Sequence, residues 1–124
     1  MQSTVMVAAL LFLSGAASGL VQAAGDASRG EQLYDSRCIA CHSLDENRVG
    51  PKHRGVYGRK AGSVPDFAYS MALTASKIVW SDTTLNRWLT NPEALIPGQR
   101  MNFQVRSAED RADLIAFLRR ESGP

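Results

Sequence analysis

The sequence predicts an all-α fold in which short helices are joined by long loops. Alternation of polar and apolar residues, the pattern of half-buried strands, never extends beyond a few residues. Helix start signals recur along the chain instead, and residues 43–66 between them are punctuated by glycines and prolines. A loop of this length needs a reason to be ordered, and a bound cofactor would provide one.

The first 23 residues are interpreted as an export signal that precedes the fold. Residues 5–13 form an apolar core, and residues 21–23 resemble a cleavage site, although no basic residue stands at the start. We therefore expect a signal peptide over residues 1–23 and one folded domain over residues 24–124. An uncleaved anchor is the alternative, because residues 4–24 carry no charge and are long enough to span a bilayer. Either way, the folded domain lies outside the cytoplasm.

The first two helices are placed by their capping residues. Asp26 can cap a helix over residues 27–37, because its carboxylate can accept the free N–H groups of the first turn. Ser70 can cap a short helix over residues 71–77 in the same way. The loop over residues 43–66 separates the two.

Two further helices complete the domain. Asp82 can cap a helix over residues 83–90, which must end near Pro92 because the ring of a proline disrupts a continuing helix. The S-x-x-D pattern at residues 107–110 fits a capping box ahead of an apolar stripe. It predicts the clearest helix of the chain, which runs to about residue 120.

The charge balance argues against nucleic-acid binding. The chain has 14 basic and 12 acidic residues, a net charge of +2. The basic excess lies between Arg29 and Arg106 and is too weak for a nucleic-acid interface. It suits docking to an acidic protein partner instead.

Both cysteines of the chain lie in one short motif, Cys38-Ile-Ala-Cys41-His42. A redox disulfide, a zinc site or thioether attachment of haem could use this spacing. A redox disulfide of the thioredoxin type needs a βαβ setting, which is absent here, and leaves His42 unexplained. A zinc ion needs four ligands; His53 is the only other histidine, and adjacent residues such as Cys41 and His42 rarely chelate one tetrahedral ion.

Haem attachment uses every residue of the motif. Two cysteines three positions apart lie about one helical turn, about 5 Å, from each other. This separation lets their sulfurs reach the vinyl groups of two neighbouring pyrrole rings. His42 is then held beneath the iron as the proximal ligand. The export signal agrees with this prediction, because haem is attached outside the cytoplasm in bacteria.

The residue at the sixth iron position distinguishes an electron carrier from a haem protein with a reactive iron. Met71 lies in an expected helix and is interpreted as core filler. Met101 follows the turn at residues 96–98, which can direct one side chain inward, and a thioether opposite a histidine raises the potential. His53 is interpreted as a surface or hydrogen-bonding residue of its loop.

The chain resembles the class I cytochromes c, the branch that contains mitochondrial cytochrome c and its soluble bacterial relatives. The resemblance covers nearly all of residues 25–120. It rests on the order and spacing of the segments GDASRGEQLY, CIACH, VGPKHRGVYGRKAG, FAYSMALTASKIVW, LNRWLTNPEALIPGQRM and DLIAFL. It implies the cytochrome c fold, with short helices and loops wrapped around one covalently bound haem c and its iron.

The resemblance also implies the residues of the haem site. Cys38 and Cys41 would hold the haem, and His42 and Met101 would be its axial ligands. The backbone carbonyl at Pro51 would accept a hydrogen bond from the proximal imidazole and fix its tautomer.

Three further residues match positions that hold a buried haem propionate: Arg59, Tyr69 and Trp80. Each offers a hydrogen-bond donor, and a buried carboxylate without donors would be costly. Two departures from the family pattern lie in the pocket. His53 stands where a leucine is usual, and Trp88 stands where a tyrosine lies near the methionine ligand.

The first and last helices are expected to pack together. Gly30 and Tyr34 match the positions of the first helix that make this contact in the family, and Leu114 and Phe117 are the expected partners. A glycine there allows close approach, which explains its presence inside a helix at a cost of about 1 kcal/mol.

The expected function is that of a periplasmic single-haem cytochrome that shuttles single electrons between redox protein partners. These are a donor and an acceptor, often membrane complexes, as in a respiratory chain. We expect a monomer that is not an enzyme and that binds neither nucleic acid nor a small-molecule substrate. The candidates for a weakly basic docking rim are Arg37, Arg48, Arg54, Lys60, Lys77 and Arg100.

Two alternatives stay open. One is a haem enzyme, or a sensor of gas or peroxide, in which Met101 is a displaceable sixth ligand. The other is an electron carrier tethered to the membrane by an uncleaved N-terminal segment.

Overall fold

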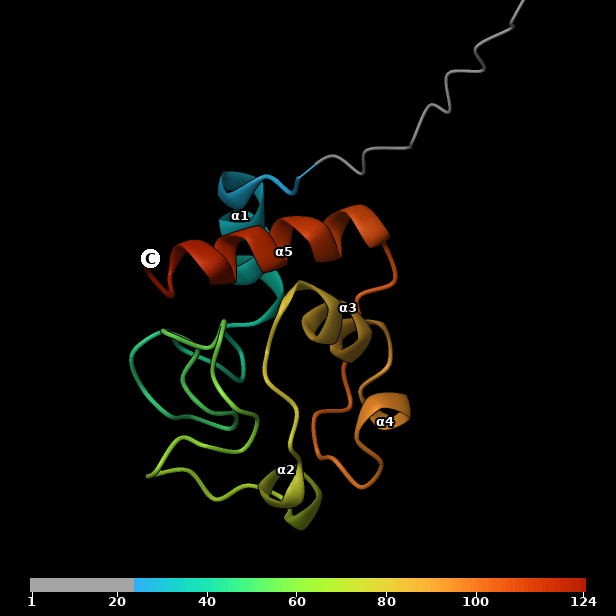
Figure 1. Ribbon diagram of the computed structural model, residues 1–124. Coiled ribbons are helices and arrows are strands. Elements are labelled where there is room, and N and C mark those ends of the chain that lie inside the picture. The colour runs from blue at the N-terminus through green and yellow to red at the C-terminus, as the bar shows by residue number, and fades with distance from the viewer. Residues whose placement is uncertain (1–23) are drawn as a thin grey trace, which may run out of the picture.

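The computed structural model describes residues 24–124, so the predicted signal peptide lies outside the described residues. Within them the only β pairing is one isolated antiparallel bridge, between Lys60 and Val79. This confirms the all-α prediction. The helices are α1 (Ala27–Arg37), α2 (Met71–Ala75), α3 (Asp82–Thr90), α4 (Pro92–Leu95) and α5 (Ala108–Arg120), as Figure 1 shows.

Helices α1 and α5, from opposite ends of the domain, cross in close contact (Figure 1). The absence of a side chain at Gly30 makes this possible. A Cβ atom there would lie 2.0 Å from the carbonyl oxygen of Asp113 and 2.9 Å from Cβ of Phe117. The rings of Tyr34 and Phe117 pack with their centroids 5.0 Å apart, and Leu114 is buried in the same core. The predicted contact between the first and last helices is therefore confirmed.

Ion pairs join the same two helices. Arg29 contacts three carboxylates of α5, among them that of Asp113 at 2.7 Å, and Arg37 contacts Asp110 at 3.0 Å. Only half of the predicted capping box forms as a result. The hydroxyl of Ser107 accepts the backbone N–H of Asp110 at 3.2 Å, but the carboxylate of Asp110 pairs with α1 instead of returning to Ser107.

Helix α2 ends at Ala75, two residues before the predicted end. Ser76 is extended, with φ −67° and ψ 141°, and its hydroxyl accepts the backbone N–H of Ile78 at 3.2 Å. Local bonds of this kind compete with the helix. The chain then continues in extended form to Val79, where it pairs with Lys60.

Helix α3 begins one residue earlier than predicted, because Ser81 is its cap and forms a reciprocal capping box with Thr84. Helix α4 was not predicted, because Pro92 was interpreted only as the end of the preceding helix. Proline is well suited to the first position of a helix, where its N–H is not needed. The side chain of Asn91 caps α4 by accepting a backbone N–H at 3.2 Å.

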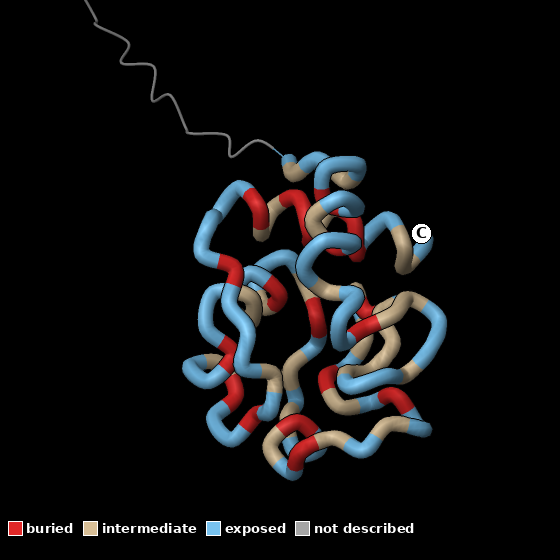
Figure 2. Tube along the Cα trace, turned by 180° about the vertical axis from the view of Figure 1, so that it is seen from behind, coloured by how far each residue is buried: buried red, intermediate tan, exposed pale blue. Residues whose placement is uncertain are grey.

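The long loop over residues 43–66 contains neither helix nor strand, as predicted, but it is well packed. Val56, Ala61 and Val64 are buried within it, and Figure 2 shows buried positions along the loops as well as in the helices. Among residues 24–124, no helix combines the length and the apolar character needed to cross a membrane.

Candidate haem site

A cavity of about 410 Å³ lies between the helices and the long loop. Its volume is within the range of about 300–1,000 Å³ that is usual for cofactor sites. Most of its lining is apolar, and α1, α2, α3, α5, the long loop and residues 100–103 contribute to it. The cavity brings together all eight site residues that the sequence analysis named, which are Cys38, Cys41, His42, Pro51, Arg59, Tyr69, Trp80 and Met101.

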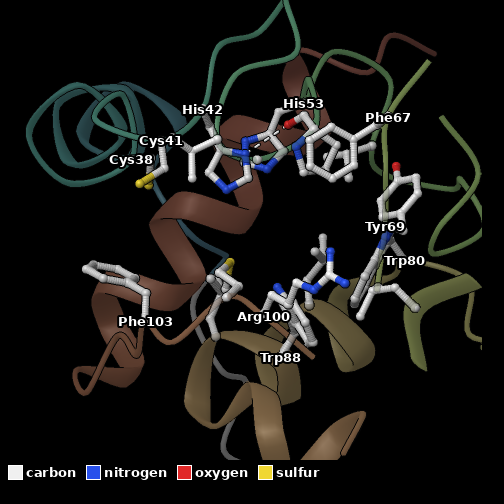
Figure 3. Close-up of a pocket in the computed structure, with 18 of the residues that line it drawn as sticks. Cys38, Cys41, His42, His53, Phe67, Tyr69, Trp80, Trp88, Arg100 and Phe103 are labelled. Carbon is white, nitrogen blue, oxygen red and sulfur yellow. Dashed lines mark hydrogen bonds between the residues drawn. The ribbon is translucent and has the colours of Figure 1, made fainter. Parts of the chain in front are cut away.

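The C-x-x-C-H motif forms the turn that follows α1. The backbone N–H groups of Cys41 and His42 both donate to the carbonyl of Cys38, at 3.1 and 2.9 Å. This turn keeps the two cysteine side chains close to each other at one edge of the cavity (Figure 3). Both are free thiols.

The two rival interpretations of the motif find no support in the structure. Burial raises the pKa of the Cys38 thiol to about 11, whereas a redox-active cysteine needs a lowered pKa. Within the described part of the chain, no group of three or more histidine, cysteine or acidic side chains could hold a metal ion. A zinc site therefore has no ligand set there.

The ring of His42 is buried and held in one orientation by its neighbours. Its Nδ1 atom lies 2.9 Å from the carbonyl oxygen of Pro51, so Nδ1 carries the proton and Nε2 keeps a lone pair for a metal. A Cβ atom at Gly50 would lie 2.1 Å from Cε1 of this ring. Burial lowers the pKa of His42, which favours the neutral form that metal ligation requires.

The two methionines differ in their surroundings. Met101 lines the cavity, after a turn in which Gly98 has a φ of 89°. Met71 is 88% exposed and does not line the cavity. The interpretation of Met71 as core filler is therefore wrong: α2 buries Leu73 and directs its first residue to solvent.

Positive charge and hydrogen-bond donors surround the cavity. Among its described lining residues none is a carboxylate, and four are cations. The guanidinium of Arg59 donates to two backbone carbonyls, at 2.8 and 3.1 Å. The hydroxyl oxygen of Tyr69 accepts a backbone N–H at 3.1 Å, which leaves its own proton free to donate. The four cations are Arg37, Arg59, Lys60 and Arg100.

These features fit a haem. In Figure 3, Tyr69 and Trp80 lie across the cavity from Cys38 and Cys41. A haem has its vinyl groups toward one edge and its two carboxylates at the opposite edge, which matches this separation of thiols from donors. The absence of carboxylates from the lining suits the negative charge of the propionates.

His53 and Trp88 contribute in ways that the sequence did not settle. The ring of His53 stacks on that of His42, with centroids 3.9 Å apart and an interplanar angle of 20°. His53 also shares a hydrogen bond with the Tyr34 hydroxyl at 3.0 Å, so its predicted surface or hydrogen-bonding role is confirmed as a hydrogen-bonding one. Trp88 packs against Trp80 at 5.3 Å between ring centroids.

Comparisons with known proteins agree with this site. The family described as Cytochrome c matches residues 27–121. Cytochrome c of Euglena viridis is 45% identical over 98 residues, covering 77% of this chain and 96% of that protein. Cytochrome c2 of Rhodomicrobium vannielii is 42% identical over 122 residues, covering 95% of this chain and 94% of that protein.

A solved structure shows the same fold. Cytochrome cH from Methylobacterium extorquens superimposes with a TM-score of 0.74 and 38% sequence identity, covering 77% of this chain and 99% of that chain. The match of the family spans the cysteine motif, the long loop and Met101. The chain therefore belongs to the cytochrome c family, whose members are electron carriers with one covalently attached haem c.

Proposed function

We propose that this protein is a periplasmic carrier that moves single electrons between a donor and an acceptor protein. When bound, the haem would supply a ferrous–ferric couple, and His42 and Met101 would hold its iron. The cavity carries this proposal, because it brings a histidine with a free Nε2, a methionine and both cysteines to one apolar space. Two strong side-chain ligands leave no iron position for a substrate, which suits electron transfer.

The other residues of the site would hold the haem and orient its histidine ligand. Cys38 and Cys41 are the thioether attachment points at one edge. The backbone carbonyl of Pro51 accepts a hydrogen bond from the Nδ1–H group of His42 and so raises the basicity of the ligand. Tyr69 and Trp80 would donate hydrogen bonds to the propionates at the opposite edge, and Arg59 would supply positive charge to them. The apolar lining excludes water and lowers the local dielectric.

The partner surface is the mouth of the cavity. Three exposed apolar side chains lie in or beside the segments that form it: Ile39, Val49 and Phe103, with exposed fractions of 46%, 77% and 41%. A small apolar centre with charges around it suits the brief encounters of redox proteins. We propose that the protein meets its partners as a monomer.

Two of the six predicted rim cations are engaged elsewhere. Arg37 pairs with Asp110, and Arg54 pairs with Asp45 and Glu121. Among the described residues, the remaining four have no carboxylate within ion-pair distance. We therefore assign the rim to Arg48, Lys60, Lys77 and Arg100.

Export supports the periplasmic assignment. Residues 1–23 have the apolar core and the small residues of a signal peptide. The match with cytochrome c2 covers 95% of this chain, more than the 101 residues from 24 to 124 could supply, so it extends into the N-terminal segment.

The test is the optical spectrum of the purified ferric protein. Methionine sulfur bound to ferric haem gives a weak long-wavelength band, and we expect this band in the native protein. Met101→Ala should abolish it. Met71→Ala is the matched control and should keep the band, because Met71 is exposed and does not line the cavity. A native protein without the band, or a Met101→Ala variant that keeps it, would contradict Met101 ligation and favour a reactive iron.

A further inference from the structure

The proximal ligand has a neighbour that the family assignment does not explain. His53 lies against the face of His42, nearly parallel to it, with ring centroids 3.9 Å apart (Figure 3). The backbone N–H of His53 donates to the carbonyl of Ser43 at 3.0 Å, which ties its loop to the residue after His42. The two stacked rings therefore come from two segments of the chain, which this backbone hydrogen bond joins next to His42.

His53 is itself held from the helical core. Its Nδ1 atom lies 3.0 Å from the hydroxyl of Tyr34, and the two rings meet edge to face, 5.6 Å apart. Tyr34 is 3% exposed and packs on Phe117, where α1 crosses α5. A continuous series of contacts thus runs from the α1–α5 interface through Tyr34 and His53 to His42.

The hydrogen bond and the glycine contact of His42 act on the edges of its ring and not on its face. The hydrogen bond from Nδ1 to Pro51 fixes one edge, and iron at Nε2 would fix the opposite edge. Rotation of the ring about the axis through its two nitrogens is then opposed by the bond to its own Cβ, and neither of these edge contacts adds a restraint on the face of the ring. Gly50 approaches the ring edge, at Cε1, and only gives it room. A flat ring on the face of His42 adds that restraint, because rotation would break the stacking contact.

We propose that His53 is a positioning residue for the proximal ligand, fixing the plane of the His42 imidazole, and that Tyr34 holds His53 in place for this purpose. The inference rests on the proposed ligation by His42. A leucine at this position could fill the space, but it could neither stack flat on an imidazole nor bond to the Tyr34 hydroxyl.

The ferric holoprotein provides a direct readout. The proton NMR shifts of the haem methyl groups depend on the orientation of the axial ligand planes, and a purely structural role of His53 would not move them. We expect His53→Leu to change the pattern of methyl shifts and to shift the midpoint potential. His53→Phe, which keeps a flat ring, should remain closer to the native pattern than His53→Leu.

Tyr34→Phe tests the second half of the proposal and removes only one oxygen. It should change the methyl pattern, and the double variant with His53→Leu should show no change beyond that of His53→Leu alone, because Tyr34 acts through His53. Tyr57→Phe is the matched control. Its hydroxyl accepts from Arg119 at 2.9 Å and Tyr57 does not line the cavity, so the native pattern should persist.

A native methyl pattern in His53→Leu would overturn the proposal, whatever happens to stability. A native pattern in Tyr34→Phe would overturn the coupling to Tyr34, and this variant decides the matter if His53→Leu does not fold. The long-wavelength band of the same samples reports Met101 ligation separately. Its absence from the native protein would contradict the proposed function, while the comparison among variants would still report the plane of His42.

Discussion

At the scale of single residues, the site depends on close approaches that leave no space for additional atoms. A Cβ atom at Gly50 would come within 2.6 Å of both nitrogens of the His42 ring. The ring is thus enclosed by a glycine at its edge, a carbonyl at Nδ1 and the stacked ring of His53 on its face. A ligand held on several sides reorganises little when the charge on its metal changes, which favours rapid electron transfer.

A surface carboxylate in the long loop, that of Asp45, gives a prediction for the pH dependence of stability. Hydrogen bonding to Arg54 lowers the pKa of Asp45 below its ordinary value of 3.8. A group with a lowered pKa in the folded state stabilises the protein above its unfolded pKa, and the contribution is lost as the pH falls through the lower, folded value. We expect Asp45→Asn to unfold at a lower temperature than the native protein at pH 6, with the difference shrinking below about pH 3.8.

The difference in unfolding temperature is measured by thermal unfolding of both proteins between pH 2.5 and 6, in steps of ~0.5 pH unit. Added salt should reduce it at pH 6, because the pair is exposed. A difference that grows on acidification would show that Asp45 acts in some other way. Asp66 is the matched control: it forms no ion pair among the described residues, so Asp66→Asn should match the native protein.

Sequence analysis predicted the residues of the site better than their surroundings. The cysteine spacing predicted Cys38, Cys41 and His42 as site residues, and all three line the cavity. The stacking of His53 could not be predicted, because a loop sequence does not reveal which side chain its residues face. Met71 was misjudged for a related reason: its helix has five residues, too few to show which side is buried.

At the scale of elements, the contact between α1 and α5 determines the architecture. Helix bounds were predicted well where a side chain caps the first turn, as Asp26 and Ser107 do. The prediction was incomplete where one residue takes part in two structural features. Pro92 ends α3 and begins α4, and Asp110 leaves its capping box to pair with Arg29 and Arg37. Tertiary contacts decide such cases, and the local sequence does not contain them.

The variant Gly30→Ala tests the contact between α1 and α5, because helix propensity and packing predict opposite signs for the change in the free energy of unfolding. Helix propensity alone predicts a gain of about 1 kcal/mol, because alanine favours the helix over glycine. The packing predicts a loss of about 1–3 kcal/mol, since the new methyl group would lie 2.0 Å from the backbone oxygen of Asp113. We expect the loss, measured as the free energy of unfolding in denaturant. A stabilised variant would mean that α1 and α5 separate easily.

At the scale of the whole molecule, the cavity occupies the place of a core. Leaving about 410 Å³ empty would cost at most about 10 kcal/mol, at about 24 cal/mol per Å³. This equals much of the total stability of a small domain, about 5–15 kcal/mol. The haem is therefore a structural component as well as the redox centre, which explains how a long loop without helix or strand is ordered.

The chain without haem should consequently fail to fold. We expect the double variant Cys38→Ser/Cys41→Ser, purified free of haem, to show little helical circular dichroism and no cooperative thermal transition. Met101→Ala, which keeps both attachment points, is the control and should remain folded. A haem-free variant with native helix content and a sharp transition would show that the polypeptide alone supplies the core.

The attachment of the first residues to the last helix has a consequence for the timing of maturation. The backbone N–H of Asp26 donates to the buried carboxylate of Asp113 at 2.7 Å, and the Cα of Gly25 lies against the carbonyl of Ala112. The predicted cleavage site, after Ala23, lies only one residue before Gly25. A peptidase needs several accessible residues on both sides of the bond that it cuts. If the chain is cut at this predicted site, the cut must precede the docking of α1 on α5, and a chain that closes first would keep residues 1–23.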